Sequence, residues 1–415
     1  MSQKNIEDIY PLSPLQQGIL FHTLYAAEPG AYFVHLGWTF RGPLDAAAFI
    51  QAFHDVIDRN PILRTAFVWE RLEKPMQIVR EQVKLPALQV DLRAFPAEER
   101  AARIQRYLET DRRKGFDLTK APLLRLAVFR TGDEEHTIVS SRHHLILDGW
   151  SLPLLFKELF ACYEARRTGV EPRLPPARPY GEYIEWLGQQ DLRSAEAFFR
   201  GQLGGFTAPT PFSVDSASSS SPSSTSAGEA GGRYDDRRIE LPEAQTAALL
   251  SFARKQKLTA STLLQGAWAL LLSRYSGEED VVFGVTVSGR SAPLPGIEQM
   301  MGLFINTLPV RVSASPGEGV LPFLRALQDR LSEMRDHEQT PLIEVQGWSG
   351  VPRGTPLFES IVVFENYPVD ASLRQGTGRL AVDELWSSSR AIYPLSVVAT
   401  LHHTLSLRID FDQDR

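Results

Sequence analysis

Segments with the apolar spacing of a helix alternate along this chain with segments of strand composition. Residues 44–59 place Phe49 and Phe53 on one helical face, whereas residues 63–70 and 123–130 are rich in β-branched and aromatic residues. The same patterns predict further helices over 151–167, 243–256, 261–275 and 321–335, and further strands over 136–144, 281–287, 308–312, 360–364 and 395–401. Such an alternation predicts a mixed α/β fold.

Two breaks in composition divide the chain. Residues 173–179 read RLPPARP, and three prolines in seven residues suit a connection between lobes rather than a helix or strand. We therefore expect an N-terminal lobe over residues 1–175 and a C-terminal lobe over residues 176–415. Within the second lobe, residues 213–232 are nearly all Ser, Gly, Ala and Pro. That stretch cannot bury enough apolar surface to offset its ordering entropy and is predicted to be a mobile loop.

Charge and composition exclude several classes of protein. The 44 Lys and Arg residues against 50 Asp and Glu residues give a net charge of −6, which does not favour nucleic acid or an anionic membrane as a partner. Cys162 is the only cysteine, so no internal disulfide can form. The most apolar helical stretch, residues 263–272, is well short of the roughly 20 residues that span a bilayer. We expect a cytoplasmic protein.

The sequence RHHLILDGWS, residues 142–151, is the strongest candidate for a reactive site. Adjacent strand residues face opposite sides, so only one of His143 and His144 can face a given cavity. Its imidazole titrates near neutrality and can accept a proton from an attacking amine or hydroxyl group. Asp148 can fix the turn or pair with an arginine. The N–H of Gly149 can face a developing oxyanion.

Other interpretations of these residues are possible. A histidine at the end of a strand is often purely structural. A metal site is not favoured, because adjacent histidines diverge and no third ligand cluster is near. Ser151 could resemble the serine that carries phosphopantetheine in carrier proteins, but it stands where a helix N-cap is required. The chain has no G-x-S-x-G elbow, Walker A loop or G-x-G-x-x-G fingerprint. A histidine-centred transferase without a bound metal is therefore the sharper hypothesis.

HHLILDGWS resembles the HHxxxDG core motif of the condensation domains of nonribosomal peptide synthetases, which are relatives of chloramphenicol acetyltransferase. Neighbouring family motifs follow in order along almost the whole chain. They are YPLSPLQQGILFH (10–22), RNPILRTAF (59–67), GFDLTKAPLLRLAVFR (115–130), YGEYIEWL (180–187), GVTVSGR (284–290), MGLFINTLPVR (301–311) and PLFESIVVFENYP (356–368). The sixth motif survives only loosely around residues 337–345. The later Arg-Asp motif is replaced by VPRGTP, so no role is transferred there.

The resemblance implies a V-shaped pseudo-dimer of two acetyltransferase-like lobes with a central tunnel. In that picture His144 faces the tunnel and is catalytic, and the N–H of Gly149 is the candidate oxyanion donor. Structural residues at the active site would be His143, Asp148, Arg64 as the arginine partner of Asp148, Trp150 and Ser151. Bridging segments are expected near residues 284–290 and 366–393, and the tunnel or bridging candidates are Ser288, Arg290, Asn306 and Arg311.

The resemblance also implies an acyltransferase that forms an amide bond between a donor acyl or peptidyl thioester and the amine of an aminoacyl thioester. Both substrates would hang on the phosphopantetheine arms of donor and acceptor carrier proteins, and the domain would bind no cofactor of its own. A neighbouring adenylation domain is implied, and the domain is expected to be a monomeric part of a multidomain synthetase. The opening LSPLQQGILFH is closer to domains that accept a D-residue donor and to some starter domains that attach a fatty acyl group, with acyl-coenzyme A as a possible donor. A catalytically silent module that only binds carriers remains the alternative of a different class.

Overall fold

The computed structural model describes residues 5–25, 30–211, 234–315, 317, 319–365, 381–388 and 393–413. The chain divides into two compact units. Unit 1 comprises residues 1–189, 294–304 and 367–390, and unit 2 comprises residues 190–293, 305–366 and 391–415. The predicted boundary between two lobes near residue 175 stays a prediction. Residues 294–304 and 367–390, from the second half of the chain, belong to unit 1. The serine-rich stretch 213–232 and most of the bridging segment expected near 366–393 lie outside the described residues.

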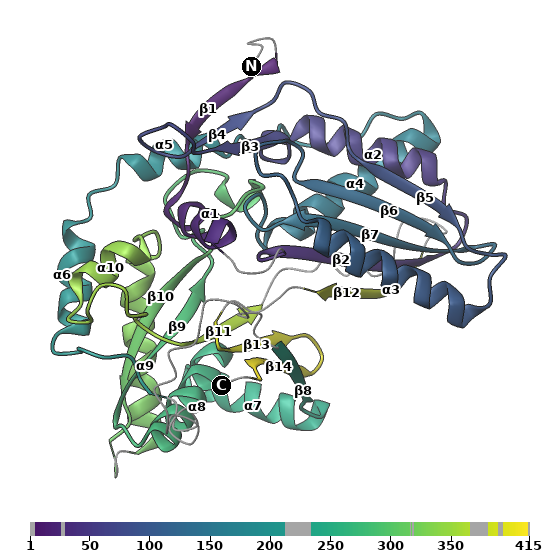
Figure 1. Cartoon of the computed structure of the whole chain (residues 1–415). Helices are drawn as coiled ribbons and strands as arrows, with labels where there is room; N and C mark the ends of the chain where they lie inside the picture. The colour runs from purple at the N-terminus through teal and green to yellow at the C-terminus, as the bar shows by residue number, and fades with distance from the viewer. Residues whose placement is uncertain are drawn as a thin grey trace, which may run out of the picture. The chain divides into compact units, whose positions relative to one another are not determined.

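Unit 1 is built around a five-stranded sheet with strand order β12-β2-β7-β6-β5 (Figure 1). Its strands are β12 (Ala381–Ser388), β2 (Phe33–Arg41), β7 (Glu135–His143), β6 (Leu124–Arg130) and β5 (Ala87–Asp91). β5 and β6 are parallel and the other pairs are antiparallel. At the centre of β2, a Cβ on Gly37 would lie 2.2 Å from the ring of Trp386 on β12. A glycine is therefore needed there for the late strand to pack closely.

The two faces of this sheet are covered in different ways. α2 (Ala46–Arg59) and α4 (Ser151–Thr168) pack aromatic rings against one face, where Trp38 meets Phe156 and Phe40 meets Phe49. α3 (Ala97–Lys114) lies on the other face (Figure 1). This mainly polar helix is held by buried Asp111, which accepts hydrogen bonds from side chains of the sheet, namely His35 at 3.3 Å, Ser141 at 2.5 Å and Arg125 at 2.8 Å.

A second, three-stranded sheet of order β1-β4-β3 completes the strands of unit 1. It consists of β1 (Asp8–Pro11), β4 (Met76–Val79) and β3 (Thr65–Val68), all antiparallel. Unit 1 also contains the helices α1 (Pro14–Tyr25) and α5 (Gly181–Gly188) and the 3-10 helices Pro61–Arg64 and Ile297–Gln299. Buried glutamines on α1 and β4 connect this part of the unit to the loop after β7.

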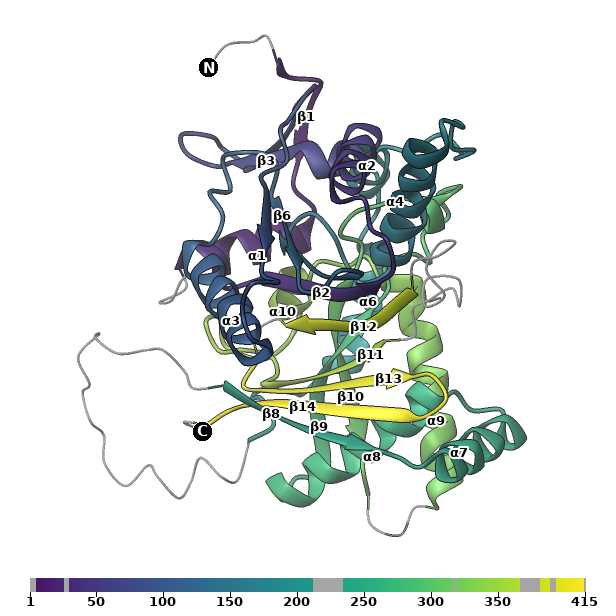
Figure 2. The ribbon, with the colours of Figure 1, turned by 90° about the vertical axis from the view of Figure 1, so that its right-hand side faces the viewer.

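Unit 2 has a six-stranded sheet of order β10-β9-β11-β13-β14-β8, in which β11 is parallel to both of its neighbours (Figure 2). The strands are β10 (Asn306–Ser313), β9 (Asp280–Val287), β11 (Ser360–Glu365), β13 (Leu395–Leu401), β14 (Leu405–Asp412) and β8 (Tyr234–Glu240). The helices are α6 (Arg193–Leu203), α7 (Glu243–Gln256), α8 (Ala260–Ser276), α9 (Val320–Met334) and α10 (Leu342–Trp348), with a 3-10 helix at Arg335–His337. Apolar side chains of α6, α8, α9 and α10 form one core with the sheet, which includes Trp268, Phe283, Leu324 and Phe358.

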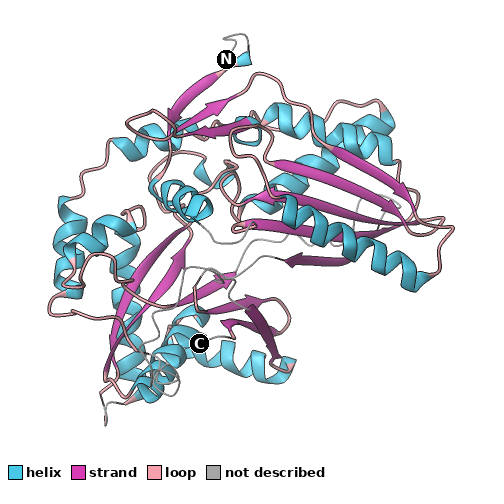
Figure 3. Ribbon diagram, in the orientation of Figure 1, coloured by secondary structure: helices cyan, strands magenta, loops and turns pink. Residues whose placement is uncertain are grey.

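Helices and strands occur in both units, which confirms the predicted mixed α/β class (Figure 3). The helix predicted over 243–256 and the strand predicted over 395–401 coincide with α7 and β13, and the other predicted elements agree to within a few residues. No described helix is long and apolar enough to cross a bilayer.

Candidate active site

The paired histidines stand where β7 ends and the loop toward α4 begins. His143 is the last residue of β7, opposite Phe33 on β2. His144 is the first residue of the loop, and its backbone N donates a hydrogen bond to the carbonyl oxygen of Tyr32 at 2.9 Å. The sheet therefore fixes the position of His143. The position of His144 depends on the residues that shape the loop.

His143 has the surroundings of a structural histidine. It is 2% exposed, its Nδ1 accepts a hydrogen bond from the backbone N of Leu145 at 3.3 Å, and its Nε2 lies 3.4 Å from Oγ1 of Thr23. Burial, reinforced by His144, lowers the pKa of His143 to about 3. A ring that is neutral and bonded at both nitrogens stabilises the strand end and has no lone pair left for a substrate.

His144 is less buried than His143. The residue is half-buried, and within the described part of the chain nothing forms a hydrogen bond with its buried Nδ1. Burial and the charge of Arg142 lower the pKa of His144, whereas its own backbone carbonyl and Asp148 raise it, with burial the largest effect. The imidazole is therefore neutral near pH 7 and can accept a proton.

Asp148 holds the other end of the loop. The residue is fully buried, and its Oδ1 accepts hydrogen bonds from the backbone N of Ser151 at 2.9 Å and from the Ser151 hydroxyl at 2.7 Å. Its Oδ2 accepts from the backbone N of Phe304 at 3.0 Å, and its own N donates to the carbonyl oxygen of Gly302 at 3.0 Å. One carboxylate thereby joins the start of α4 to residues 302–304, a segment more than 150 residues later.

Gly302 is tightly enclosed at this junction. A Cβ on Gly302 would lie 2.3 Å from the ring of Tyr180, whose hydroxyl donates to the carbonyl oxygen of Leu303 at 2.6 Å. The N–H of Gly302 donates to the Ser151 hydroxyl at 3.1 Å. Parts of three of the sequence motifs, at residues 142–151, 180–187 and 301–311, therefore meet around Asp148.

The predicted pairing of Arg64 with Asp148 is wrong. Arg64 donates to Glu7 at 2.5 Å, to the carbonyl oxygen of Ile57 at 3.2 Å and to the carbonyl oxygen of Arg80. It stands at the end of the 3-10 helix Pro61–Arg64, where it holds the small sheet together. Asp148 instead has its carboxylate oxygens bonded to backbone N–H groups and a serine hydroxyl.

The predicted N-cap role of Ser151 also needs correction. Ser151 is the first residue of α4, and the cap position is occupied by Trp150, whose indole Nε1 donates to the carbonyl oxygen of Glu298 at 3.4 Å. The orphan N–H of the first turn is satisfied by the Asp148 carboxylate, which does what an N-cap side chain usually does. The Ser151 hydroxyl instead links Asp148 to Gly302.

Gly149 offers a free backbone donor beside this junction. Its carbonyl oxygen accepts from the backbone N of Leu152 at 3.2 Å, while no residue in the described ranges accepts a hydrogen bond from its N–H. The residue is half-buried. A free amide in a fixed loop, five residues after His144, can donate a hydrogen bond to a substrate oxygen.

The candidates on unit 2 form bonds within that unit. Arg311 is ion-paired with Asp280 at 2.6 Å, and Nδ2 of Asn306 donates to the carbonyl oxygens of Glu338 at 2.9 Å and Thr340 at 2.7 Å. These contacts join β10 to β9 and to the turn before α10.

The remaining two candidates, Ser288 and Arg290, lie in the loop after β9, where the backbone N of Arg290 donates to the Ser288 hydroxyl at 3.3 Å. Buried Glu338 accepts from the backbone N of Gly289 at 3.0 Å and from the Ser291 hydroxyl at 3.1 Å. Burial raises the pKa of Glu338. Sequence reasoning missed this carboxylate, which lies in the poorly matching sixth motif.

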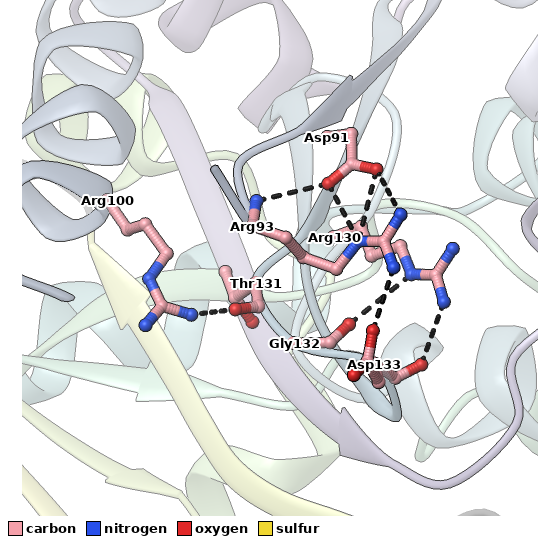
Figure 4. Close-up of polar contacts among 7 residues, drawn as sticks. All are labelled: Asp91, Arg93, Arg100, Arg130, Thr131, Gly132 and Asp133. Carbon is pink, nitrogen blue, oxygen red and sulfur yellow. Dashed lines mark hydrogen bonds and ion pairs between the residues drawn. The ribbon is translucent and has the colours of Figure 1, made fainter. Parts of the chain in front are cut away.

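A cavity of about 710 Å³ lies elsewhere in unit 1, between residues 43–46, residues 89–91 and the β6–β7 hairpin, and none of the candidate residues lines it. Polar side chains at this end of the sheet bond to one another and to backbone carbonyls (Figure 4). Arg93 donates to Asp91 and to Asp133, and Arg130 donates to the carbonyl oxygens of Gly132 and Asp133. Across the described residues, no group of three or more His, Cys, Asp or Glu side chains could hold a metal ion.

Comparison with known proteins gives matches over almost the whole chain. The family model described as "Condensation domain" matches residues 6–415. One of the proteins that make up the linear gramicidin synthase of Brevibacillus parabrevis is 43% identical over 418 residues, which are 99% of this chain and 5% of that protein. Bacitracin synthase 3 of Bacillus licheniformis is 36% identical over 411 residues, which are 98% of this chain and 6% of that protein. The chain thus spans a small part of the curated relatives that it matches.

Two solved structures show the same fold at low sequence identity. The first condensation domain of the calcium-dependent antibiotic synthetase, in complex with a substrate analogue, has a TM-score of 0.78 at 19% identity and covers 99% of this chain and 92% of that chain. A mutant of the starter condensation domain of rhizomide synthetase, in complex with C8-CoA, has a TM-score of 0.79 at 20% identity and covers 98% of this chain and 90% of that chain.

Proposed function

The chain belongs to the condensation domain family, and from this membership we propose that it is an acyltransferase of a nonribosomal peptide synthetase. It joins a donor acyl or peptidyl thioester to the amine of an aminoacyl thioester on an acceptor carrier protein. The observation that supports this best is the loop after β7. It carries a half-buried, neutral His144 and, five residues later, a Gly149 whose N–H is free, in a backbone fixed by Asp148.

The proposed reaction needs little from the protein besides position and one proton acceptor. The neutral acceptor amine attacks the thioester carbonyl, and its nitrogen forms a bond to the carbonyl carbon. The oxyanion accepts a hydrogen bond from Gly149 N–H. His144 accepts the amine proton, the carbon–sulfur bond breaks, and the leaving thiolate takes this proton from the imidazolium, which returns His144 to its neutral form. Holding both tethered reactants together contributes about 7–11 kcal/mol in favourable geometry, and a positioned base about 10²- to 10⁴-fold in rate.

The substrates and partners are part of the proposal. They are thioesters on the phosphopantetheine arms of a donor and an acceptor carrier protein, with an adenylation domain as a neighbour in the same synthetase. His144 serves as the base or as the group that orients the amine. The segments around Ser288 and Arg290, and those around Asn306 and Arg311, are proposed to border the path of the substrates.

Mass spectrometry of carrier-bound products tests this function. The chain is mixed with an acceptor carrier loaded with an L-amino acid and with donor carriers that hold a D-aminoacyl, an L-aminoacyl or an octanoyl group, or with octanoyl-coenzyme A. We expect one donor class to be transferred and the His144→Ala variant to lose that transfer. A wild-type rate in His144→Ala would contradict the role of His144. Binding of carriers without product from any donor would show a silent carrier-binding module instead.

A further inference from the structure

A buried glutamine on α1 uses both ends of its side-chain amide. The Oε1 of Gln16 accepts hydrogen bonds from the backbone N of Ser13 at 2.9 Å and from Nε2 of Gln77 at 2.8 Å. Its Nε2 donates to Oε1 of Gln77 at 3.1 Å and to the carbonyl oxygen of Leu145 at 3.0 Å. Gln16 and Gln77 are both fully buried. All the hydrogen-bonding capacity of the Gln16 amide is therefore used.

The bond to Leu145 reaches the loop next to the proposed catalytic ring. Leu145 directly follows His144, and the backbone N of His144 is already bonded to the carbonyl oxygen of Tyr32 at 2.9 Å. The backbone around His144 is thus held on its N-terminal side by Tyr32 and on its C-terminal side by Gln16. Side-chain direction follows backbone position, so a change in either contact moves the imidazole.

We propose that Gln16 is a positioning residue that sets the place of the His144 imidazole by holding the carbonyl of Leu145. This inference rests on the proposed function of His144. Gln16 touches no reacting atom and acts only through the loop. Its other contacts explain why it can do so, because the Ser13 and Gln77 bonds fix the amide within α1 and β4, both of which are regular elements of unit 1.

A purely structural role for Gln16 makes a different prediction. Gln77 shares the paired amide bonds and donates to the carbonyl oxygen of Pro11 at 3.0 Å, but its bonds do not reach the loop after β7. Loss of either glutamine leaves buried polar groups without partners and lowers stability. Only loss of Gln16 removes the bond to Leu145. Substitution of either glutamine should therefore lower stability, but only substitution of Gln16 should lower kcat.

The test uses Gln16→Met, Gln77→Met and the double variant, with kcat, KM and the free energy of unfolding in urea measured for each. The substrates are the donor and acceptor carrier pair that the wild-type chain turns over. Gln16→Met should lower kcat by about 10- to 100-fold, the size of effect expected for a displaced reacting group, with KM near the wild-type value. Gln77→Met should lose comparable stability and keep kcat within a few-fold of wild type. The double variant should regain stability relative to the sum of the single changes, because both partners of the amide pair are then apolar, while its kcat stays low.

Three outcomes would overturn the inference: wild-type kcat in Gln16→Met, an equal loss of kcat in Gln77→Met, or recovery of kcat together with stability in the double variant. If Gln16→Met does not fold, Gln16→Asn, which keeps the amide but shortens it by one methylene, is read in the same way. His144→Ala is measured alongside. An active His144→Ala would remove the proposed function of the ring, whereas an inactive His144→Ala with an active Gln16→Met would remove only the role of Gln16.

Discussion

The loop after β7 in unit 1 and the loop after β9 in unit 2 are organised by the same device. In each, a buried carboxylate accepts hydrogen bonds from a backbone N–H and a serine hydroxyl, with Asp148 in the first loop and Glu338 in the second. Only the first loop carries an imidazole. The carboxylates therefore account for the shape of the loops, and the difference in chemistry between them comes from His144.

The two carboxylates differ in where they come from. Asp148 lies within the loop that it shapes and bonds to Ser151, three residues later. Glu338 reaches Gly289 from 49 residues further along the chain. The first arrangement is a local turn followed by a helix, so its residues lie close together in the sequence and form a recognisable motif. The second depends on the tertiary fold and leaves a weaker signal.

The sharpest way to break the comparison is to remove the imidazole. His144→Ala should leave both loops intact, since its backbone N keeps its bond to Tyr32. Its condensation rate should fall by about 10²- to 10⁴-fold, the usual contribution of a positioned base. Single-turnover mass spectrometry measures the rate, and circular dichroism checks the fold. A rate within a few-fold of wild type would mean that the two loops do not differ in the way proposed.

Removal of the carboxylate in unit 1 should affect stability most. Asp148→Ala leaves the N–H groups of Ser151 and Phe304 without their acceptor in a fully buried place. At about 1–3 kcal/mol for each unsatisfied donor, the free energy of unfolding should fall by about 2–6 kcal/mol. Urea unfolding measures this loss. An unchanged midpoint would contradict the structural role of Asp148.

The carboxyl group of Glu338 in unit 2 should make the free energy of unfolding depend on pH. The folded-state pKa of Glu338 is raised by burial above the ordinary value of 4.5, so the folded chain binds a proton at a pH where the unfolded chain does not. Wild-type stability should therefore rise, through this group, as the pH falls through the folded pKa, and the gain is complete below 4.5. Glu338→Gln should lack this rise. Parallel stability curves for the two proteins between pH 4 and 8 would contradict the assignment.

The parts of the fold that the sequence predicted are those with local periodic signals. α2 and α4 present regular apolar faces, and both were predicted. α3 is mainly polar, with a narrow apolar face of Ile104, Tyr107 and Leu108 against the sheet and buried Asp111 beside it, and it was not predicted. Strand β2 was also missed, although it pairs with β7 beside the paired histidines.

For the site, the sequence singled out the loop residues but not their partners. Asp148 bonds to Phe304, 156 residues away, and Gln16 bonds to Leu145, 129 residues away. Such distances leave no periodicity to detect. The one available signal was the S-x-x-Q capping box at Ser13 and Gln16, whose reciprocal bonds the structure contains.

The smallest expected effect concerns a third carboxylate, which lies at the surface. Glu7 is ion-paired with Arg64, but its side chain is 42% exposed. The Arg64 side chain is only 5% exposed, but it keeps its bonds to backbone carbonyls without Glu7 and is not left unpaired. Glu7→Gln should therefore change the free energy of unfolding by about 1 kcal/mol or less and leave kcat unchanged. A large fall in kcat would show that Arg64 affects the loop of Asp148. It would support the functional connection between Arg64 and Asp148 that the sequence predicted and that the contacts of Arg64 do not show.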